Sequence, residues 1–215
     1  PTEWRYVGGL GNRQVDSLHI WLRTTGLVEP DGTTTWLCAQ FGQRGVNDLP
    51  LWQCVWANTV LYWPVAAWYT QCSGLGSLTT TELSRLLSED QRQLASRTVY
   101  DAILELVGLL ERTPIGRELG QGEVTGRRPR AVRRLGLPSP DPLALAYALR
   151  GLARRERRTD LPLSESLLWP WIIFGCDRGD ALATLAAYGE GWLRWSDTAL
   201  HLLLPLEELD HAHLR

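Results

Sequence analysis

The chain has 215 residues, of which 44% are hydrophobic and 21% are charged, a composition typical of globular proteins that excludes a collagen-like or disordered chain. Its formal net charge is −2, so any attraction to nucleic acid or to a membrane has to come from local clusters of charge. All 22 basic residues are arginine, which binds phosphate in a bidentate manner that lysine cannot match.

The first element along the chain is a predicted helix. Apolar residues recur there at helical spacing, at Val15, Leu18 and Leu22. A short strand at residues 27–28, a Pro-Asp-Gly turn at residues 30–32 and a second strand of β-branched and aromatic residues over 33–39 are predicted to follow. Helix, strand, turn, strand is the order of a winged helix. We therefore predict a winged helix-turn-helix DNA-binding domain over residues 1–48, incomplete at its N-terminus.

Residues 49–81 carry no charge and are numerous enough to cross a bilayer. Polar residues interrupt the stretch, however, and its tryptophans would lie at mid-membrane depth, whereas tryptophan prefers the membrane interface. We therefore predict no membrane segment but two packed core helices, over residues 52–61 and 65–72, broken at Pro64.

The remaining elements follow from capping, periodicity and turn residues. Thr79 and Glu82 fit a capping box before a helix that runs through Leu87. Further helices are predicted over residues 97–111, 143–152 and 179–188, and a strand over 192–195. The expected fold class is mainly α with small β-hairpins. Its C-terminal helical region, residues 49–215, carries an arginine-rich hairpin at about 117–142, in which Val124 and Val132 flank the turn.

Polar residues are concentrated at the start of the first helix. The candidates for DNA contact there are Asn12, Arg13, Gln14 and Ser17. The first residues of a recognition helix meet base edges in the major groove, where arginine pairs with guanine and Asn or Gln with adenine. Asp16 is unfavourable beside phosphates, and a winged helix that binds only protein is the alternative.

Two arginine clusters follow later in the chain. The first has no acidic residue within it and comprises Arg127, Arg128, Arg130, Arg133 and Arg134. A basic hairpin of this kind can follow phosphates, which position a protein on DNA without specifying sequence; the alternative is a solvated loop. The second lies at a predicted helix end, where arginine also complements the helix dipole, and comprises Arg150, Arg154, Arg155, Arg157 and Arg158.

Catalytic and metal-binding signals are weak. The four cysteines form no C-x-x-C pair, which predicts reduced thiols, a cytoplasmic location and no metal site. No phosphate-binding loop, nucleophile elbow or H-E-x-x-H motif is present. Catalytic residues are therefore left unassigned, and no cofactor is evident, although a divalent metal remains open.

Several segments in order resemble the SspB-type family, a domain of unknown function (4007) encoded beside DNA phosphorothioation genes. They are "LGNRQVDSLHIWLRTTGLVE", "LPLWQCVWANTVLYWPVAAWY", "SRTVYDAILELVGLLERTPIGRELG", "DPLALAYALRGL" and "GWLRWSDTALHLLL". The last contains Trp195 and, after Ser196, Asp197 and Thr198, which are similar to a family Trp-Asp-Thr motif. The resemblance covers residues 10–204.

The resemblance implies a DNA-nicking component of bacterial DNA sulfur modification and phage defence. The implied partners are double-stranded DNA, a cysteine desulfurase, an ATP-dependent sulfur-transfer enzyme and an ATPase. A homo-oligomer is left open. The alternative is a non-catalytic DNA-binding adaptor or transcriptional regulator.

Overall fold

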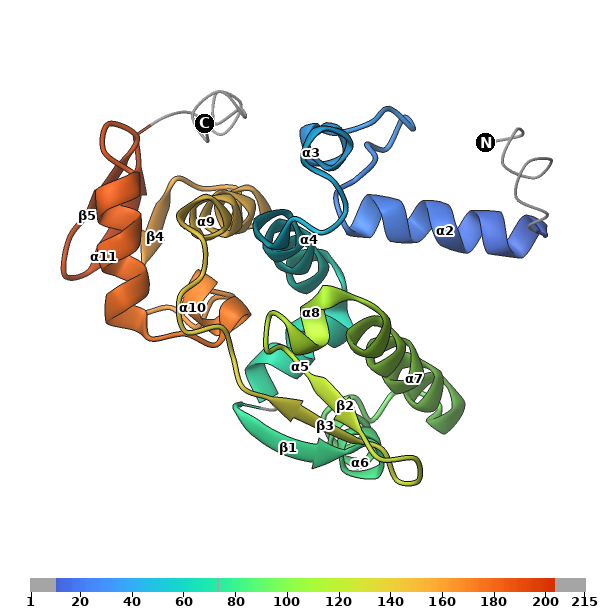
Figure 1. The fold of residues 1–215 in the computed structure, drawn as a ribbon. Helices are drawn as coiled ribbons and strands as arrows, with labels where there is room; N and C mark the ends of the chain where they lie inside the picture. Colours follow the sequence, from blue (N-terminus) through green and yellow to red (C-terminus); the bar gives the residue numbers. More distant parts are fainter. Residues whose placement is uncertain (1–10, 73, 204–215) are drawn as a thin grey trace.

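The structure is a computed structural model that describes residues 11–72 and 74–203. The described chain is mainly helical, with two small antiparallel sheets, as expected (Figure 1). Four helices come first: α2 (Asn12–Thr24), α3 (Trp36–Arg44), α4 (Leu49–Tyr62) and α5 (Pro64–Cys72). They place the uncharged stretch of the sequence at the centre of the molecule.

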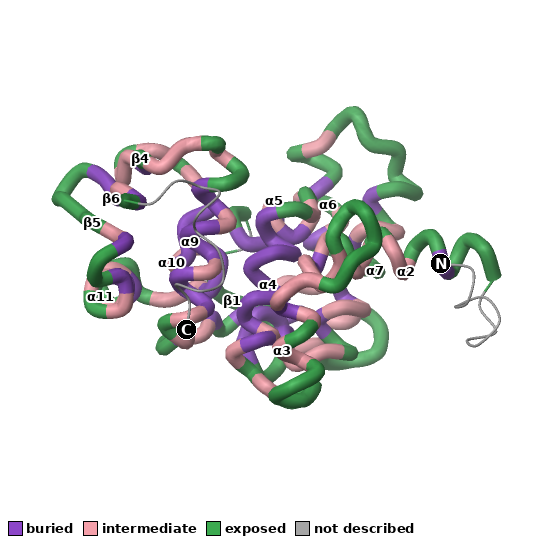
Figure 2. Tube along the Cα trace, turned by 90° about the horizontal axis from the view of Figure 1, so that it is seen from above, coloured by how far each residue is buried: buried purple, intermediate pink, exposed green. Residues whose placement is uncertain are grey.

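Helix α4 is buried nearly all round, and Figure 2 shows it within the purple interior. Asp48 caps its start, because the Leu51 backbone N–H donates to Asp48 Oδ1 at 3.1 Å. Trp63 ends it, and Pro64 begins α5. The prediction of two core helices is therefore confirmed. Within the part of the chain that the structure describes, no helix is long and apolar enough to cross a membrane.

The second strand predicted over residues 33–39 is wrong, because the chain is helical from Trp36 onward. The Thr35 hydroxyl donates to Gly26 O at 2.6 Å and accepts from the Cys38 backbone N–H at 3.3 Å. This N-cap starts α3 and overrides the β-propensity of the residues around it. Only a single antiparallel bridge, between Val28 and Thr34, remains of the predicted wing.

The middle of the chain forms a helical layer and a three-stranded sheet of order β1-β3-β2. Its elements are β1 (Gly76–Thr79), α6 (Thr80–Asp90), α7 (Ser96–Arg112), α8 (Pro114–Arg117), β2 (Glu123–Thr125) and β3 (Ala131–Arg134). The capping box of Thr79 and Glu82 is confirmed, with the Glu82 backbone N–H donating to Thr79 Oγ1 at 3.2 Å. Val124 pairs with Val132 across the hairpin, as predicted.

The C-terminal part packs a long helix against α4 and ends in a second sheet of order β4-β6-β5. Its elements are α9 (Pro142–Glu156), β4 (Asp160–Pro162), α10 (Pro170–Phe174), α11 (Arg178–Tyr188), β5 (Leu193–Trp195) and β6 (Ala199–Leu202). The predicted helices at 143–152 and 179–188 and the strand at 192–195 correspond to α9, α11 and β5. Sequence patterns missed β4, α10 and β6.

One buried cluster connects these parts. It includes Leu37 of α3, Trp56 of α4, Ile103 of α7, Leu149 of α9 and Leu200 of β6. Helix α3, which precedes residue 48, therefore shares its core with the helices that follow.

Candidate functional site

The polar start of α2 is exposed, and α2 extends away from the molecular body (Figure 1). Asn12 and Arg13 lie on its first turn and face solvent. Gln14 has a structural task, since its Oε1 accepts from the Gly11 backbone N–H at 2.9 Å. Ser17 lines a hollow that it shares with Trp63, the residue after α4, and with Glu105 of α7. All four candidate residues are exposed, and Asn12 and Arg13 lie on the first turn of the helix.

The hairpin of β2 and β3 divides its arginines into different environments. Arg127 and Arg128 lie in the exposed turn, and Arg133 is exposed on β3. Arg130 is half-buried and forms an ion pair with Glu111, with Nη1 and Oε2 3.0 Å apart. The exposed arginines available for phosphate binding are therefore Arg127, Arg128 and Arg133.

Arg134 is inside the molecule, with 3% of its surface exposed, and the prediction that it contacts DNA is corrected. Its Nε donates to Gln121 Oε1 at 3.2 Å and its Nη1 to Thr70 O at 2.9 Å. Its Nη2 donates to Ile172 O at 2.8 Å and to Ile173 O at 3.1 Å. Arg134 therefore joins β3 to the ends of α5 and α10. Burial lowers the pKa of its guanidinium.

Strand periodicity carried the signal that separates Arg133 from Arg134. Val132 is buried on β3, and side chains two residues apart share a face of a strand. Arg134 consequently points inward with Val132, while Arg133 points outward. The sequence analysis treated these arginines as one cluster and did not consider that neighbouring side chains on a strand point to opposite faces.

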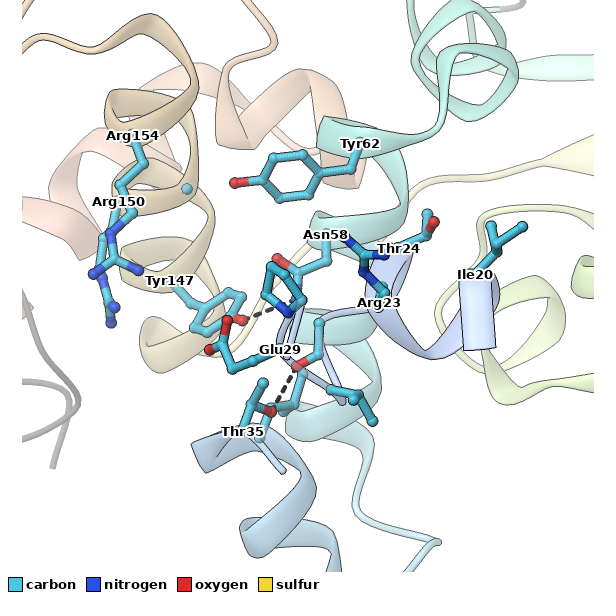
Figure 3. A pocket seen from close by; sticks show the side chains of 15 residues that line it. Ile20, Arg23, Thr24, Glu29, Thr35, Asn58, Tyr62, Tyr147, Arg150 and Arg154 are labelled. Carbon is cyan, nitrogen blue, oxygen red and sulfur yellow. Dashed lines mark hydrogen bonds between the residues drawn. The ribbon is translucent and has the colours of Figure 1, made fainter. Parts of the chain in front are cut away.

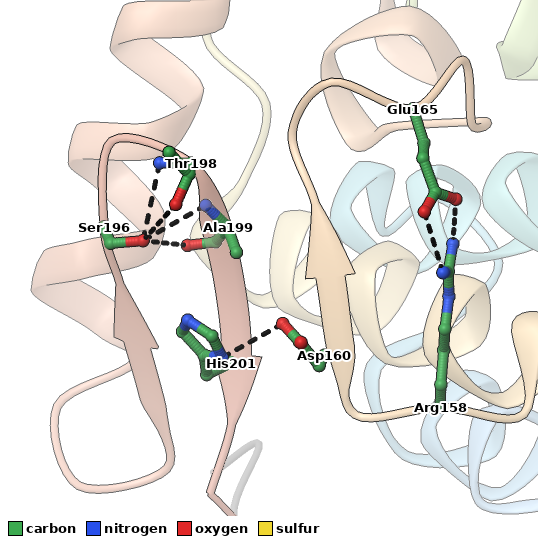
Figure 4. Close-up of polar contacts among 7 residues, drawn as sticks. All are labelled: Arg158, Asp160, Glu165, Ser196, Thr198, Ala199 and His201. Carbon is green, nitrogen blue, oxygen red and sulfur yellow. Dashed lines mark hydrogen bonds and ion pairs between the residues drawn. The ribbon is translucent and has the colours of Figure 1, made fainter.

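The second arginine cluster is also divided. Arg155 donates to Leu61 O at 3.1 Å, and Arg158 pairs with Glu165 in the contact drawn in Figure 4. Arg157 adopts a left-handed conformation, φ 55°, where α9 ends. Arg150, 4% exposed, and Arg154 line a cleft.

This cleft has a volume of about 520 Å³ and was not anticipated from the sequence. Figure 3 shows its walls: α2, the loop before α3, α4 and α9. Its polar and charged side chains are those of Arg23, Thr24, Glu29, Thr35, Asn58, Tyr62, Tyr147, Arg150 and Arg154. They come from segments far apart in sequence, so no local motif could have revealed them.

Asn58 fixes the floor of the cleft. Its Nδ2 donates to Thr25 O at 2.9 Å. It also donates to the Tyr147 hydroxyl at 2.9 Å, the bond drawn in Figure 3. Gly26 passes so close that a Cβ there would lie 2.0 Å from Asn58 Nδ2. Burial raises the pKa of Tyr147 to about 12. The phenol therefore stays protonated further into the alkaline range than an ordinary tyrosine.

A histidine and a carboxylate meet on the second sheet. Asp160 and His201 are register partners of β4 and β6, and His201 Nδ1 lies 3.0 Å from Asp160 Oδ1 (Figure 4). Ser196 lies on the neighbouring β5–β6 turn, but its hydroxyl is used within that turn, where it accepts from the Ala199 backbone N–H at 3.1 Å. The arrangement holds the imidazole in place on an exposed surface.

Among residues 11–72 and 74–203, no group of three or more His, Cys, Asp or Glu side chains is placed to hold a metal ion. Comparison of the chain with protein-family models, with curated proteins and with solved structures found no significant match. The resemblance to the SspB-type family therefore stays a prediction.

Proposed function

We propose that the protein binds duplex DNA through the exposed arginines of its β2–β3 hairpin. The observation that carries the proposal is the exposure of Arg127, Arg128 and Arg133 on a segment with no acidic residue between 124 and 134. Guanidinium groups that face solvent can form bidentate contacts with phosphate oxygens. Such contacts supply affinity without sequence preference.

A second part of the proposal concerns α2. Asn12 and Arg13 are exposed on the first turn of a helix whose start extends from the body. In this geometry the start of α2 would enter a major groove, where Arg13 pairs with guanine and Asn12 with adenine. The hairpin would then provide affinity, and α2 would provide sequence preference.

The setting that we propose for this binding is bacterial DNA phosphorothioation, on the resemblance of the sequence to the SspB-type family. In that setting the protein nicks one strand for sulfur incorporation, alongside a cysteine desulfurase, an ATP-dependent sulfur-transfer enzyme and an ATPase, in the cytoplasm. Charge on the reacting phosphate would be stabilised by arginine or by a metal. A non-catalytic DNA-binding adaptor is the competing proposal.

The binding proposal is tested by anisotropy of a labelled duplex over a range of salt concentrations. The triple variant Arg127→Gln, Arg128→Gln, Arg133→Gln should bind more weakly, and the slope of log affinity against log salt should become shallower by about one unit per lost contact. The matched control removes three exposed arginines elsewhere: Arg85→Gln, Arg92→Gln and Arg178→Gln. Equal slopes in the two triple variants would overturn the hairpin assignment.

The nicking proposal is tested separately, by conversion of supercoiled plasmid to open circles with and without EDTA. Nicking that the hairpin triple variant loses and the control retains supports a nickase. Retention of DNA binding without nicking in either condition supports the adaptor. If nicking is lost when EDTA is present but occurs when it is absent, a metal takes part.

A further inference from the structure

A small hollow lies between α2, the junction of α4 with α5, and α7, and Figure 1 shows α2 and α7 on the same side of the molecule. The residues that line it are Ser17, Ile20, Trp21, Thr24, Trp63 and Glu105. Its volume is about 190 Å³, whereas small-molecule and cofactor sites begin at about 300 Å³. The hollow can therefore hold one functional group or side chain, but not a whole cofactor.

Two tryptophans form a corner of this hollow. The ring centroids of Trp21 and Trp63 are 4.9 Å apart, and the rings meet at 75°. The backbone of Trp63 is fixed at the junction of two helices, because its N–H donates to Thr59 O at 2.9 Å and its carbonyl accepts from the Ala67 N–H at 3.1 Å. The faces of indole rings attract cations more strongly than those of other aromatic side chains. The corner is thus a fixed pair of walls that favours a positive charge.

Glu105 adds a carboxylate to the same hollow. It is exposed on α7, and among the described lining residues it is the one charged side chain. A carboxylate accepts short, charge-assisted hydrogen bonds from a cation that carries N–H groups. The indole corner and Glu105 therefore select for the same kind of group, a cation with hydrogen-bond donors.

Guanidinium fits this combination better than ammonium. It is planar, weakly hydrated and able to stack on an aromatic face, and it presents paired N–H groups to a carboxylate, whereas ammonium is a strongly hydrated point charge. The molecule contains both contacts elsewhere. The guanidinium of Arg178 lies 5.5 Å from the ring centroid of Trp171, and Arg158 donates two hydrogen bonds to Glu165.

We propose that the hollow binds a guanidinium group, carried by an arginine side chain of a protein partner or by a small guanidino compound. The group stacks in the corner of Trp21 and Trp63 and donates to Glu105. The proposal does not rest on duplex binding by the hairpin, since the described hairpin arginines do not line the hollow.

The test is a titration of the full chain, with ¹⁵N-labelled indoles, at constant ionic strength. The probes are ethylguanidinium, ethylammonium and the blocked tripeptide acetyl-Gly-Arg-Gly-amide. We expect ethylguanidinium and the tripeptide to shift the indole N–H resonances of Trp21 and Trp63, and ethylammonium to bind at least about threefold more weakly. Tighter binding of the tripeptide than of ethylguanidinium supports a protein side chain as the source, and equal binding supports a free compound. Ethylammonium binding as tightly as ethylguanidinium would overturn the guanidinium assignment.

Two variants test the site itself. Glu105→Gln should weaken ethylguanidinium binding about threefold to fivefold, as expected for loss of a half-exposed charge pair, and Glu118→Gln, exposed and outside the hollow, is the matched control. Trp21→Leu keeps an apolar wall but removes one ring face, and should also weaken binding. The indole resonance of the buried Trp56 reports that each variant is folded. Equal losses in Glu105→Gln and Glu118→Gln, or no shift of either indole up to about 20 mM ethylguanidinium, would overturn the site.

Discussion

Arg133 and Arg134 show that the surroundings of an arginine determine whether it can bind a partner or supports the fold. The two are adjacent on β3 and identical in type, yet one faces solvent and the other satisfies backbone carbonyls of α5 and α10. Composition and local charge cannot distinguish them. Only the position of Val132, and the long-range packing of two helix ends against β3, decides which is structural.

This difference predicts opposite responses to the same substitution. Arg134→Gln should lower the free energy of unfolding by about 2–5 kcal/mol, because it leaves buried carbonyl oxygens without donors. Arg133→Gln, the matched control on the same strand, should change it by less than about 0.5 kcal/mol. Urea denaturation followed by circular dichroism measures both. Similar losses in the two variants would contradict the burial of Arg134.

Tyr147 and Tyr69 predict a loss of stability at alkaline pH. Burial raises the pKa of each to about 12, above the ordinary value of about 10. Between these two values the folded state binds more protons than the unfolded state, so stability falls as pH rises. The contribution of the two tyrosines to the free energy of unfolding is therefore fully present below about pH 10 and is lost as the pH rises toward 12.

The corresponding variant is Tyr147→Phe. It should reduce the fall in unfolding free energy between pH 9 and pH 11 without abolishing it, because Tyr69 retains its share. The exposed Tyr100→Phe serves as control. A fall of the same size in Tyr147→Phe and in the unsubstituted protein would show that Tyr147 does not couple folding to pH.

Alanine substitution at two glycines with positive φ distinguishes the cost of backbone strain from the cost of a steric clash. Gly32, φ +90°, has no atom within 4 Å of a built Cβ, whereas at Gly26, φ +73°, the Cβ would meet Asn58. Gly32→Ala should therefore cost about 1 kcal/mol, from backbone strain alone. Gly26→Ala should cost at least about 1–3 kcal/mol more, because Asn58 must give up buried hydrogen bonds. Thermal unfolding of both variants tests the difference.

At the scale of elements, the sequence predicted long and well-capped segments best. The apolar stripe of α7, the Pro64 break and the Thr79–Glu82 capping box are all local signals, and each is confirmed. The start of α3 was missed because Trp36 and its neighbours favour strand by propensity. One of the two hydrogen bonds of the Thr35 hydroxyl, to Gly26 O, also spans nine residues. The short strands β4 and β6 pair across about 40 residues, which periodicity does not register.

Helix α4 is the element on which the others depend most. Trp56 is fully buried, and its indole N–H donates to Ile173 O of α10 at 2.9 Å. Trp56→Ala should lower the free energy of unfolding by about 3–5 kcal/mol, from lost burial and the cavity that remains. Trp195→Ala, on an exposed position of β5, is the control and should cost far less. Comparable losses would argue against a central position of α4.

The whole molecule is organised around one apolar cluster that includes residues of α3 as well as of β6. The sequence predicted a domain boundary near residue 48, because the order of helix, strand, turn and strand before it is that of a winged helix. The cleft likewise assembles residues between positions 20 and 154. The shared core and the cleft both combine residues that are far apart in sequence. No short stretch of sequence contains a motif for either, so only the folded structure reveals them.

A shared core predicts one cooperative unfolding transition. Far-ultraviolet circular dichroism and tryptophan fluorescence should give the same urea midpoint. Two transitions, with an early one confined to residues 11–48, would instead favour the domain boundary predicted from the sequence. A proteolysis time course in urea would identify the segment that unfolds first.

Because α4 is enclosed, the labelling rate of its thiol, Cys54, measures how often the interior opens. Cys54 is fully buried, and burial raises the pKa of its thiol, whereas Cys72 at the end of α5 is exposed. A maleimide reagent reaches Cys54 only in molecules whose helices have separated, while Cys72 reacts from the folded state. The ratio of the two labelling rates therefore records how often the interior opens. The native chain thus carries both the probe and its internal reference.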